Sequence, residues 1–312
     1  MNAVHESPPM TQFPLKGLRG TLRENEPLAG HTTWRVGGPA QHFYQPADID
    51  DLAAFLRQLA PAEPVFWLGL GSNLLVRDGG LRGTVIATSG VLNKLVQLDP
   101  YTVRAEAGVP CAKVARFAAQ ASLGGGEFLA GIPGTMGGAL AMNAGAFGGE
   151  TWELVAKVET LDRRGQRHLR TPQEYQIAYR SVTGLHSNAG QEWFVAAHLH
   201  FEPGDSGAGK ARIRQLLERR NLTQPTNQPN AGSVFRNPPG NFAAHLIESA
   251  GLKGICIGGA CVSEKHANFI INTGAATAAD IEALIVKIIE AVELKHAVRL
   301  KTEIHIVGDA HV

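Results

Sequence analysis

The chain has 312 residues, of which 44% are hydrophobic, and a formal charge of +1 from 29 basic and 28 acidic side chains. This length exceeds what one hydrophobic core usually supports, so we expect two or three lobes. The balanced charge gives no overall field for nucleic acid or an anionic membrane, and no apolar run approaches the roughly 20 residues of a membrane span. We therefore expect a cytoplasmic protein that binds neither nucleic acid nor membrane.

Strands and short helices alternate over the first two thirds of the chain. Apolar runs at 65–70 and 84–88 predict buried strands, and the alternation at 101–107 predicts a half-exposed strand. Residues 48–60 and 111–121 carry apolar side chains at helical spacing, which predicts two helices. Further strands are expected at 153–161 and 193–201. The alternation indicates lobes of the α/β or α+β class.

The last third begins with a polar, glycine-rich segment without periodicity at 202–209, which predicts the main domain boundary. The elements expected after it are a basic helix at 210–221, a helix at 241–250, a strand at 268–272, an amphipathic helix opening at Asp280 and a final strand at 302–307. We therefore expect a flexible tail at 1–15, a first domain at 16–204 with lobes at about 16–90 and 91–204, and a C-terminal domain at 205–312.

Cysteines and histidines give little support for a metal site. Cys111, Cys256 and Cys261 form no C-x-x-C pair and are odd in number, so we expect reduced thiols rather than a disulfide framework or a zinc site. His198 and His200 share one side of a predicted strand, but no third ligand is recognisable nearby. A solvated strand face is the favoured interpretation, and no metal is expected.

Two glycine-rich segments indicate places where the backbone approaches a ligand. The segment 68–78 begins G-x-G after a strand, but Leu74 stands where a dinucleotide fingerprint has its third glycine, so a Rossmann site is disfavoured. A diphosphate nest and an ordinary tight turn both stay open there. The segment 130–150 has seven glycines in 21 residues, and we expect it to form a cofactor cradle rather than a regular helix or strand.

Three polar residues outside these segments are unremarkable when taken alone. Ser233 has no G-x-S-x-G elbow and no assignable Asp and His, so a hydrolase triad is unsupported and a loop hydroxyl is the plain interpretation. Arg180 and Glu303 are interpreted as surface ion-pair residues. Composition and spacing lead only to a nucleotide-binding α+β protein.

Taken together and in order, the same segments resemble the family of UDP-N-acetylenolpyruvoylglucosamine reductases, the MurB family. The matching blocks are residues 32–40, 68–78, 131–150, 179–181, 224–238, 246–254, 258–269 and Glu303. The interval from Arg180 to Ser233, which leaves residues 181–232 between them, is similar to that of the shorter class, which lacks an inserted loop carrying a tyrosine.

The resemblance implies an α+β fold in which an FAD-binding domain of the vanillyl-alcohol-oxidase (PCMH) type, with two α/β lobes, precedes a C-terminal α+β substrate-binding domain. It implies catalytic roles for Arg180, Ser233 and Glu303. The implied substrate contacts are Tyr179, Arg236, Asn237 and Lys253. The implied cofactor contacts are Gly69, Gly71, Ser72, Asn73, Gly131, Ile132, Pro133, Gly134, Thr135, Gly137, Gly138, Asn143 and Gly145.

The implied activity is the NADPH-dependent, FAD-mediated reduction of UDP-N-acetylglucosamine enolpyruvate to UDP-N-acetylmuramate in peptidoglycan precursor synthesis, by a monomeric enzyme. Flavin N5 delivers hydride to C3, Arg180 stabilises the enolate, Ser233 protonates C2, and Glu303 joins the stabilisation if protonated. The arginines at 212–220 either meet the UDP diphosphate or form a solvated face. Two alternatives stay open: a flavin oxidase of the same cofactor fold acting on another sugar or alcohol, and a nucleotide-binding regulatory protein without turnover.

Overall fold

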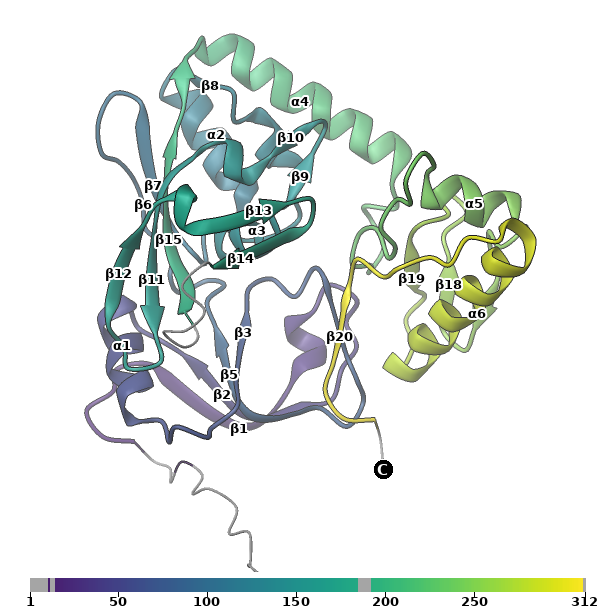
Figure 1. The fold of residues 1–312 in the computed structure, drawn as a ribbon, viewed down its shortest axis with the longest axis horizontal. Coiled ribbons are helices and arrows are strands. Elements are labelled where there is room, and N and C mark those ends of the chain that lie inside the picture. Colours follow the sequence, from purple (N-terminus) through teal and green to yellow (C-terminus); the bar gives the residue numbers. More distant parts are fainter. Residues whose placement is uncertain (1–10, 12–14, 185–191, 311–312) are drawn as a thin grey trace, which may run out of the picture.

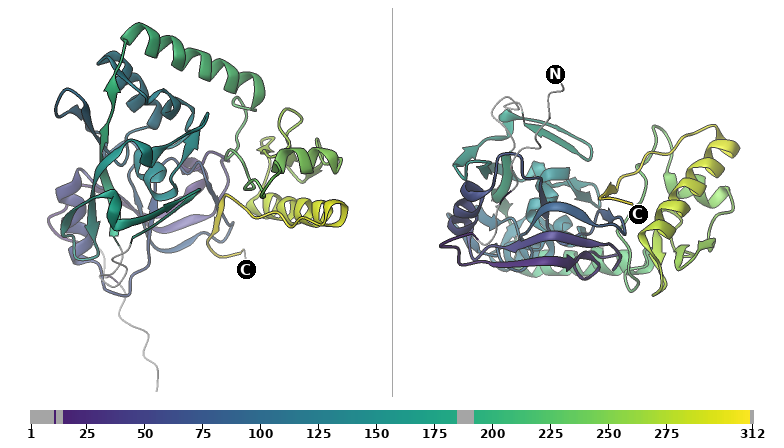
Figure 2. Two further views of the ribbon diagram at one scale, coloured as in Figure 1. Left: turned by 45° about the horizontal axis from the view of Figure 1, so that its top comes forward. Right: turned by 90° about the horizontal axis from the view of Figure 1, so that it is seen from below.

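The computed structural model describes residue 11 and residues 15–184 and 192–310. Two lobes lie one above the other in Figure 1, and the C-terminal domain stands beside them. Helix α4 (Ser206–Thr223) runs from the upper lobe to the C-terminal domain, as the left view of Figure 2 also shows. Most of the expected tail at 1–15 lies outside the described residues, but the backbone N–H of Thr11 donates to Glu63 Oε2 at 3.3 Å.

The lower lobe is built on a four-stranded sheet. Its strands follow the order β1 (Thr21–Pro27), β2 (Pro39–Gln45), β5 (Leu81–Ala87) and β3 (Val65–Leu68). β1 is antiparallel to β2, whereas β2 and β3 both run parallel to β5. Helix α1 (Ile49–Gln58) begins after Asp48, whose side chain accepts the N–H of Asp51 at 2.9 Å and caps the helix. Leu52 and Phe55 are fully buried, so the predicted amphipathic helix is confirmed.

The upper lobe is built on a five-stranded antiparallel sheet. Its strands follow the order β12 (Arg167–Arg170), β11 (Val155–Asp162), β15 (Glu192–His200), β7 (Thr102–Glu106) and β6 (Leu95–Gln97). Helices α2 (Cys111–Gln120) and α3 (Met136–Met142) cover one face of this sheet. On the other face Leu161 and Val195 pack in one cluster with the apolar residues of α1, so the two lobes share a core.

The histidine pair on β15 is only half solvated. His200 is exposed, but His198 Nε2 lies 2.8 Å from Glu159 Oε1 and its side chain is 19% exposed. Arg104 binds the same carboxylate through Nε at 2.6 Å and Nη2 at 2.8 Å. The expected solvated face is therefore wrong for His198, because the neighbouring strands β7 and β11 supply partners that the sequence of β15 does not reveal.

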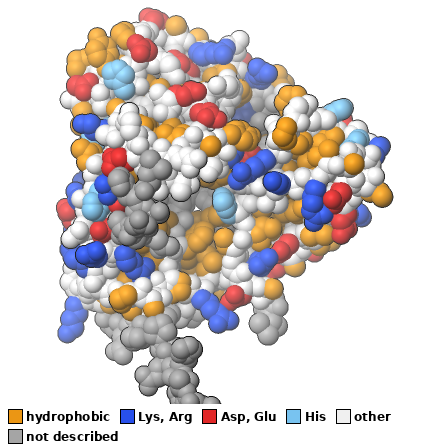
Figure 3. Space-filling model, viewed as in Figure 1, with side chains coloured by type: hydrophobic (Ala, Val, Ile, Leu, Met, Phe, Trp, Pro, Cys, Tyr) orange, Lys and Arg blue, Asp and Glu red, His pale blue; other side chains and the backbone are white. Residues whose placement is uncertain are grey.

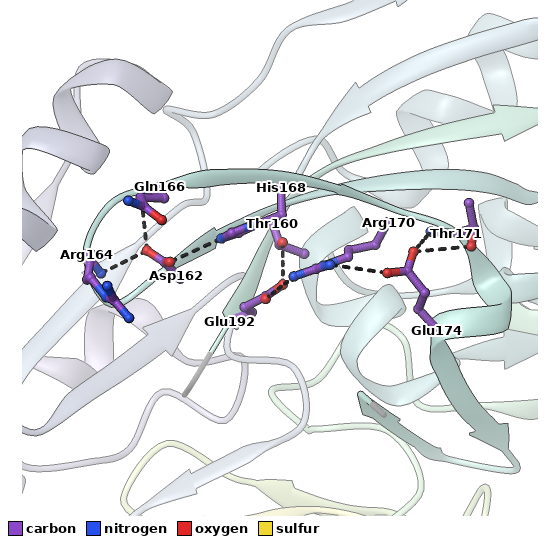
Figure 4. A network of polar contacts seen from close by, with 9 residues as sticks. All are labelled: Thr160, Asp162, Arg164, Gln166, His168, Arg170, Thr171, Glu174 and Glu192. Atoms are coloured by element: carbon purple, nitrogen blue, oxygen red, sulfur yellow. Dashed lines mark hydrogen bonds and ion pairs between the residues drawn. The ribbon is translucent and has the colours of Figure 1, made fainter. Parts of the chain in front are cut away.

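A second polar network follows β11, β12 and the start of β15 (Figure 4). Arg170 donates to Glu192 Oε1 at 2.6 Å and to Glu174 Oε1 at 3.2 Å, and His168 Nε2 lies 3.1 Å from Asp162 Oδ2. Because these charges neutralise one another at the edge of the sheet, we interpret the network as structural. Within the described ranges no group of three or more His, Cys, Asp or Glu is placed to hold a metal ion.

Helix α3 corrects one expectation about the glycine-rich segment 130–150. We expected no regular helix there, but Met136 and Gly137 open α3 and their N–H groups donate to Val109 O at 2.9 Å and Ala107 O at 2.8 Å. A Cβ added to Gly137 would lie 2.9 Å from the Ala107 side chain. The glycine thus permits close packing of α3 on the segment after β7, which offsets its entropic cost.

Helix α4 begins inside the segment 202–209, where the sequence predicts a domain boundary without regular structure. The helix begins four residues earlier than predicted because the Asp205 side chain accepts the N–H of Ala208 at 2.7 Å. Gly209 is buried, and a Cβ there would lie 3.1 Å from Ala119 Cβ on α2. Glycine in this segment therefore serves helix packing against the upper lobe rather than flexibility.

The C-terminal domain packs α5 (Ala243–Ser249) and α6 (Ala278–His296) around an antiparallel sheet. The sheet has the order β17 (Cys256–Ile257), β18 (Ala260–Val262) and β19 (Ile270–Asn272). In α6 the predicted stripe is buried at Ile281, Leu284 and Ile288. The helix begins before Asp280 because Thr277 and Asp280 form a reciprocal capping box. Finally β20 (His305–Val307) leaves the domain and pairs in parallel with β4 (Leu74–Val76) of the lower lobe.

A disulfide joins Cys256 and Cys261, so the expected reduced state is wrong for these two cysteines. They are cross-strand partners on β17 and β18, with Cα atoms 4.1 Å apart. Cys111 is a free, buried thiol whose pKa burial raises to about 12. The odd count concealed the pair, because pairing depends on the register of a hairpin rather than on the number of cysteines.

The remaining elements are short. They are the strands β8 (Leu123–Gly124), β9 (Gly145–Ala146), β10 (Gly149–Glu150), β13 (Tyr175–Ala178), β14 (Ser181–Gly184) and β16 (Glu202–Pro203), and the 3-10 turns η1 (Leu28–His31), η2 (Glu127–Gly131), η3 (Thr151–Glu153) and η4 (Pro172–Glu174). In the part of the chain that the structure describes, no helix combines the length and apolar character needed to cross a membrane.

Candidate active site

Arg180 and Glu303 form an ion pair between the upper lobe and the segment that precedes β20. Arg180 lies at the turn of the β13–β14 hairpin, and its Nε donates to Glu303 Oε1 at 2.7 Å. The two side chains are only 17% and 13% exposed. Surface ion pairs are the plain expectation for these residues, but both side chains are partly buried, so removal of one partner should cost more than at an exposed pair. Two residues that lie 123 positions apart thus meet at one place.

The Arg180 guanidinium is held in a fixed orientation. Nη1 donates to Asn143 O at 3.4 Å and Nη2 donates to Gly145 O at 3.3 Å, while the Tyr179 ring centroid lies 5.0 Å from Cζ. Arg180 has a left-handed backbone with φ of 55°. A side chain other than glycine rarely adopts this conformation, and such strain concentrates at functional sites.

Ser233 lies in a segment whose backbone is hydrogen-bonded to the backbone of Glu303. The N–H of Glu303 donates to Val234 O at 2.7 Å, so the residue after Ser233 is paired with the Glu303 backbone. Val234 N in turn donates to Asn268 O at 2.9 Å, and the Asn268 side chain binds both backbone groups of Phe235. The segments of the three expected catalytic residues therefore converge.

Asn73 connects the first glycine-rich segment to the backbone around Glu303. Its Nδ2 donates to Glu303 O at 3.1 Å, and its carbonyl accepts the N–H of His305 at 3.0 Å. Gly71 has φ of 65°, and a Cβ there would lie 2.3 Å from His31 O. The turn after β3 therefore requires glycine at this position, and it brings the segment beside Glu303.

The two glycine-rich segments lie against each other. A Cβ on Gly69 would lie 2.5 Å from Thr135 Oγ1, whereas a Cβ on Gly134 would make ordinary contact with Ser72 Oγ at 3.5 Å. Thr135 is 2% exposed, and its Oγ1 is buried without a hydrogen-bond partner among the described residues. A buried hydroxyl without a partner is costly, so these residues fit a bound group that supplies a polar atom.

The glycines of the second segment fall into two classes. Those that pack against protein would clash with their neighbours if they carried a side chain: Gly131 with Phe147, Gly137 with Ala107, and Gly145 with Gly149 O. A Cβ on Gly134 or Gly138 would meet no atom closer than 3.5 Å. Only the second class leaves space that a ligand can approach.

A cavity of about 370 Å³ opens beside these residues. It is lined by Ser72 and Pro133 from the lobes and by Gly232 and Phe269 from the C-terminal domain. Arg35 and Arg220 also line it, and among the described residues no Asp or Glu does. Such a cavity suits an anion. Figure 3 shows Lys and Arg side chains gathered where the C-terminal domain meets the lobes.

Arg220 separates from the other arginines of α4. Arg212, Arg214 and Arg219 are exposed, whereas Arg220 is half-buried, and its Nε donates to Gln224 Oε1 at 3.2 Å. Burial lowers the pKa of its guanidinium. Of the two interpretations left open by the sequence, the solvated face therefore holds for three of these arginines, whereas Arg220 lines the cavity.

Of the four expected substrate contacts, Tyr179 and Arg236 lie near Arg180, whereas Asn237 and Lys253 have other partners. Tyr179 stacks on Arg180, and the pKa of its phenol is raised by burial first and by Glu303 second, while Arg180 and Arg236 oppose this. Arg236 Nε is buried without a partner among the described residues. Asn237 Oδ1 accepts the N–H of Ala243, and Lys253 Nζ pairs with Glu248 at 2.7 Å. No contact between described residues joins these last two to Arg180 or Glu303.

Three contributors to the site were not predicted individually. Asn268 holds the Ser233 segment, Glu150 accepts a hydrogen bond from Asn143, and Arg35 lines the cavity. Each of the three residues lies inside one of the blocks that match the family, and this position in the sequence is the signal that could have found them. Their roles depend on contacts between distant segments.

Comparison with known proteins gives matches over nearly the whole chain. Residues 40–169 match the family model of an FAD binding domain, and residues 224–307 match that of the UDP-N-acetylenolpyruvoylglucosamine reductase C-terminal domain. These matches confirm the expected α+β fold, with an FAD-binding domain ahead of a C-terminal domain.

Individual relatives give the same result. The UDP-N-acetylenolpyruvoylglucosamine reductase of Methylococcus capsulatus is 60% identical over 98% of this chain and 99% of its own length. That of Coxiella burnetii is 52% identical over 93% of this chain and 97% of its own. The crystal structure of UDP-N-acetylenolpyruvylglucosamine reductase (MurB) from Thermus caldophilus is 30% identical, with a TM-score of 0.77 over 93% of this chain and 99% of that one.

Proposed function

Since this chain belongs to the family of UDP-N-acetylenolpyruvoylglucosamine reductases, FAD-dependent oxidoreductases of peptidoglycan precursor synthesis, we propose that it reduces UDP-N-acetylglucosamine enolpyruvate to UDP-N-acetylmuramate with NADPH as donor. The observation that carries the proposal is the partly buried Arg180–Glu303 pair, which lies against the Ser233 segment and beside the glycine-rich cradle. Action as a monomer in the cytoplasm stays a prediction.

We assign FAD to the cradle formed by residues 69–73 and 131–138. Thr135 Oγ1 supports this assignment because it is buried and lacks a protein partner, and Gly134 and Gly138 because a side chain there would enter open space. When bound, FAD accepts hydride from NADPH and supplies it to the enolpyruvyl group. The role of the protein is to bind, orient and exclude water around that exchange.

Arg180 is proposed to stabilise negative charge on the substrate. Reduction at C3 leaves charge on C2 that spreads into the adjacent carboxylate, and a fixed cation lowers the energy of that state. A guanidinium has five N–H donors, of which Arg180 uses one each on Glu303, Asn143 and Gly145. Two donors are left to face a substrate carboxylate, and the other three hold them in place.

Ser233 is proposed to protonate C2. A carbanion-like centre is basic enough to take a proton from a hydroxyl, provided that the hydroxyl is positioned. The left-handed Gly232, with φ of 73°, and the bonds from Val234 to Asn268 and Glu303 fix the backbone on both sides of Ser233. This support is what a general acid requires.

Arg220 and Arg35 are proposed to meet a nucleotide diphosphate. Substrate and donor both carry one, and the half-buried Arg220 guanidinium, which pairs with no carboxylate among the described residues, gains most from an anionic ligand. The resemblance implies Lys253 as a substrate contact, but its pairing with Glu248 makes Arg220 the better candidate for the diphosphate.

The Ser233→Ala variant tests the assignment of the acid. We expect reduction of the flavin by NADPH to keep its rate, and reoxidation by the enolpyruvyl substrate to slow by about 10²- to 10⁴-fold, the usual contribution of a positioned general acid. Anaerobic stopped-flow absorbance separates the two half-reactions. Reoxidation at the rate of the unmodified enzyme would remove Ser233 from the mechanism.

A further inference from the structure

Asn143 lies between the glycine-rich cradle and Arg180. It ends α3 in a left-handed conformation, with φ of 44°, and it is 1% exposed. Its neighbours in sequence suggested a cofactor contact. Protein atoms, however, cover it almost completely, so its role has to be sought in what it binds within the chain.

The amide of Asn143 is fully engaged by the protein. Nδ2 donates to Glu150 Oε2 at 2.7 Å and to Ala178 O at 3.4 Å, and Oδ1 accepts the N–H of Trp152 at 3.2 Å. A side-chain amide has two N–H donors, and both are in use. No donor is left for a bound molecule, and burial closes access to the remaining lone pair of Oδ1.

These bonds hold Arg180 from two directions. Ala178 is the last residue of β13, two positions before Arg180 at the turn of the hairpin. The Asn143 carbonyl accepts directly from Arg180 Nη1 at 3.4 Å. Asn143 therefore fixes both the strand that presents Arg180 and one arm of its guanidinium.

Glu150 completes the arrangement as a second carboxylate near the hairpin. It pairs with Gly145, whose carbonyl accepts from Arg180 Nη2, in the short β9–β10 ladder. The pKa of the Tyr179 phenol is raised mainly by burial, then by Glu303, with Glu150 as a smaller contributor. The charge of Glu150 therefore acts electrostatically on Tyr179, at the turn of the β13–β14 hairpin.

We propose that Asn143 and Glu150 are positioning residues for Arg180, which orient its guanidinium toward the substrate, rather than contacts of the cofactor. The inference rests on the proposed function for the identity of the substrate. Because Asn143 binds the hairpin and Glu150 binds Asn143, a change in either moves Arg180 without touching the cradle.

An exchange of the two groups tests this coupling. Asn143→Asp tolerates the left-handed backbone but places a carboxylate against Glu150, so we expect the hairpin to shift. The double change Asn143→Asp with Glu150→Gln restores the hydrogen bond between the two side chains with donor and acceptor reversed, whereas the donation to Ala178 O stays lost. Asn25→Asp is the matched control, because Asn25 is also left-handed, with φ of 51°, but is exposed on β1.

Reoxidation of NADPH-reduced flavin by UDP-N-acetylglucosamine enolpyruvate is expected to slow roughly 10- to 100-fold in Asn143→Asp, as for a misplaced catalytic group. The double variant recovers part of the rate, because the repulsion between two carboxylates is removed while the bond to Ala178 O is still missing. FAD content and the rate of flavin reduction stay at the level of Asn25→Asp in both. Loss of FAD from Asn143→Asp, with normal reoxidation of the holoenzyme that remains, would overturn the inference.

A measurement that needs no substrate separates this inference from the proposed function. Hydrogen exchange of the Arg180 Nε–H group is followed by 15N NMR, with the signal assigned through its absence in Arg180→Lys. We expect faster exchange in Asn143→Asp and a return toward the original rate in the double variant. Unchanged exchange refutes the inference. If the unmodified enzyme is not reoxidised by the substrate, the proposed function fails and the exchange result alone decides.

Discussion

Two buried polar atoms at the candidate site, Thr135 Oγ1 and Arg236 Nε, have no hydrogen-bond partner among the described residues. A folded protein rarely leaves such atoms unpaired unless a ligand or water completes them. Thr135 borders the cradle, and Arg236 acts electrostatically on Tyr179 beside Arg180. At the scale of single residues, we interpret these two atoms as proposed contacts of bound groups.

Thr135→Val gives a direct test of that interpretation. Removing a hydroxyl that has no protein partner is expected to leave the stability of the apoprotein unchanged or slightly raised. If the hydroxyl binds FAD, its loss weakens FAD affinity by about 0.5 to 1.5 kcal/mol, or roughly 2- to 13-fold. Thermal unfolding of the apoprotein and titration with FAD measure the two effects. A large loss of stability with unchanged FAD affinity would show that Thr135 is structural.

At the scale of elements, the periodic segments were predictable and the close-packed ones were not. The stripe of α6, with Ile281, Leu284 and Ile288, is visible in the sequence because a helix that packs on one side repeats its apolar residues. Helix α3 escaped prediction because Gly137 has a low helix propensity, and only its contact with Ala107 explains it. The disulfide of Cys256 and Cys261 escaped for a similar reason, since it depends on hairpin register.

The sheet of the upper lobe carries a testable dependence of stability on pH. Hydrogen bonds from Arg104, and then His198, hold the pKa of Glu159 at about 2, below its ordinary value of 4.5. A carboxylate with a depressed pKa stabilises the fold above the pKa of the unfolded chain, and this contribution disappears as the pH falls from about 4.5 toward 2. The contribution is about 3 kcal/mol at neutral pH.

Glu159→Gln should therefore lower the free energy of unfolding at pH 7 and flatten its decline between pH 5 and pH 3. Urea unfolding at several pH values measures this. Glu24→Gln, which changes an exposed residue of β1, serves as the control and should keep the full pH dependence. An equal decline in both variants would assign the acid sensitivity to other carboxylates.

At the scale of the whole molecule, two residues that directly follow β4 bind the lower lobe to helix α6 of the C-terminal domain. Asp78 accepts the N–H groups of Ala278 and Ala279 at 3.0 Å each, at the start of α6. Arg77 binds Glu282 of the same helix through Nε at 2.9 Å and Nη2 at 2.7 Å. A cap supplied by a residue 200 positions away fixes α6 against the lobe.

Asp78→Ala is expected to lower the stability of the first turn of α6 by about 1 to 2 kcal/mol, the usual contribution of a helix cap. Hydrogen exchange in the first turns of α6 should accelerate by roughly tenfold while that of α4 stays unchanged. Asp205→Ala is the matched control, because Asp205 caps α4 within its own part of the chain and should affect only that helix. Equal protection of α6 with and without Asp78 would show that the cap does not hold the domain.

The candidate site shows the same division between what the sequence reveals and what it does not. Family resemblance located Arg180, Ser233 and Glu303, although each is unremarkable by composition and spacing. Their meeting depends on a hairpin, a loop and the pairing of β20 with β4, contacts that join positions more than 100 residues apart. Long-range pairing of this kind leaves no periodic signal along the chain.

The proposed reaction at Arg180, Glu303 and Ser233 is tested most directly by one anaerobic experiment. Purified protein with bound FAD is reduced with NADPH, and UDP-N-acetylglucosamine enolpyruvate is then added without oxygen while flavin absorbance near ~450 nm is recorded. We predict that the absorbance returns in step with the formation of UDP-N-acetylmuramate, one equivalent for each flavin. A flavin that stays reduced in the presence of excess substrate, and regains its colour only when air is admitted, would contradict the proposed reaction.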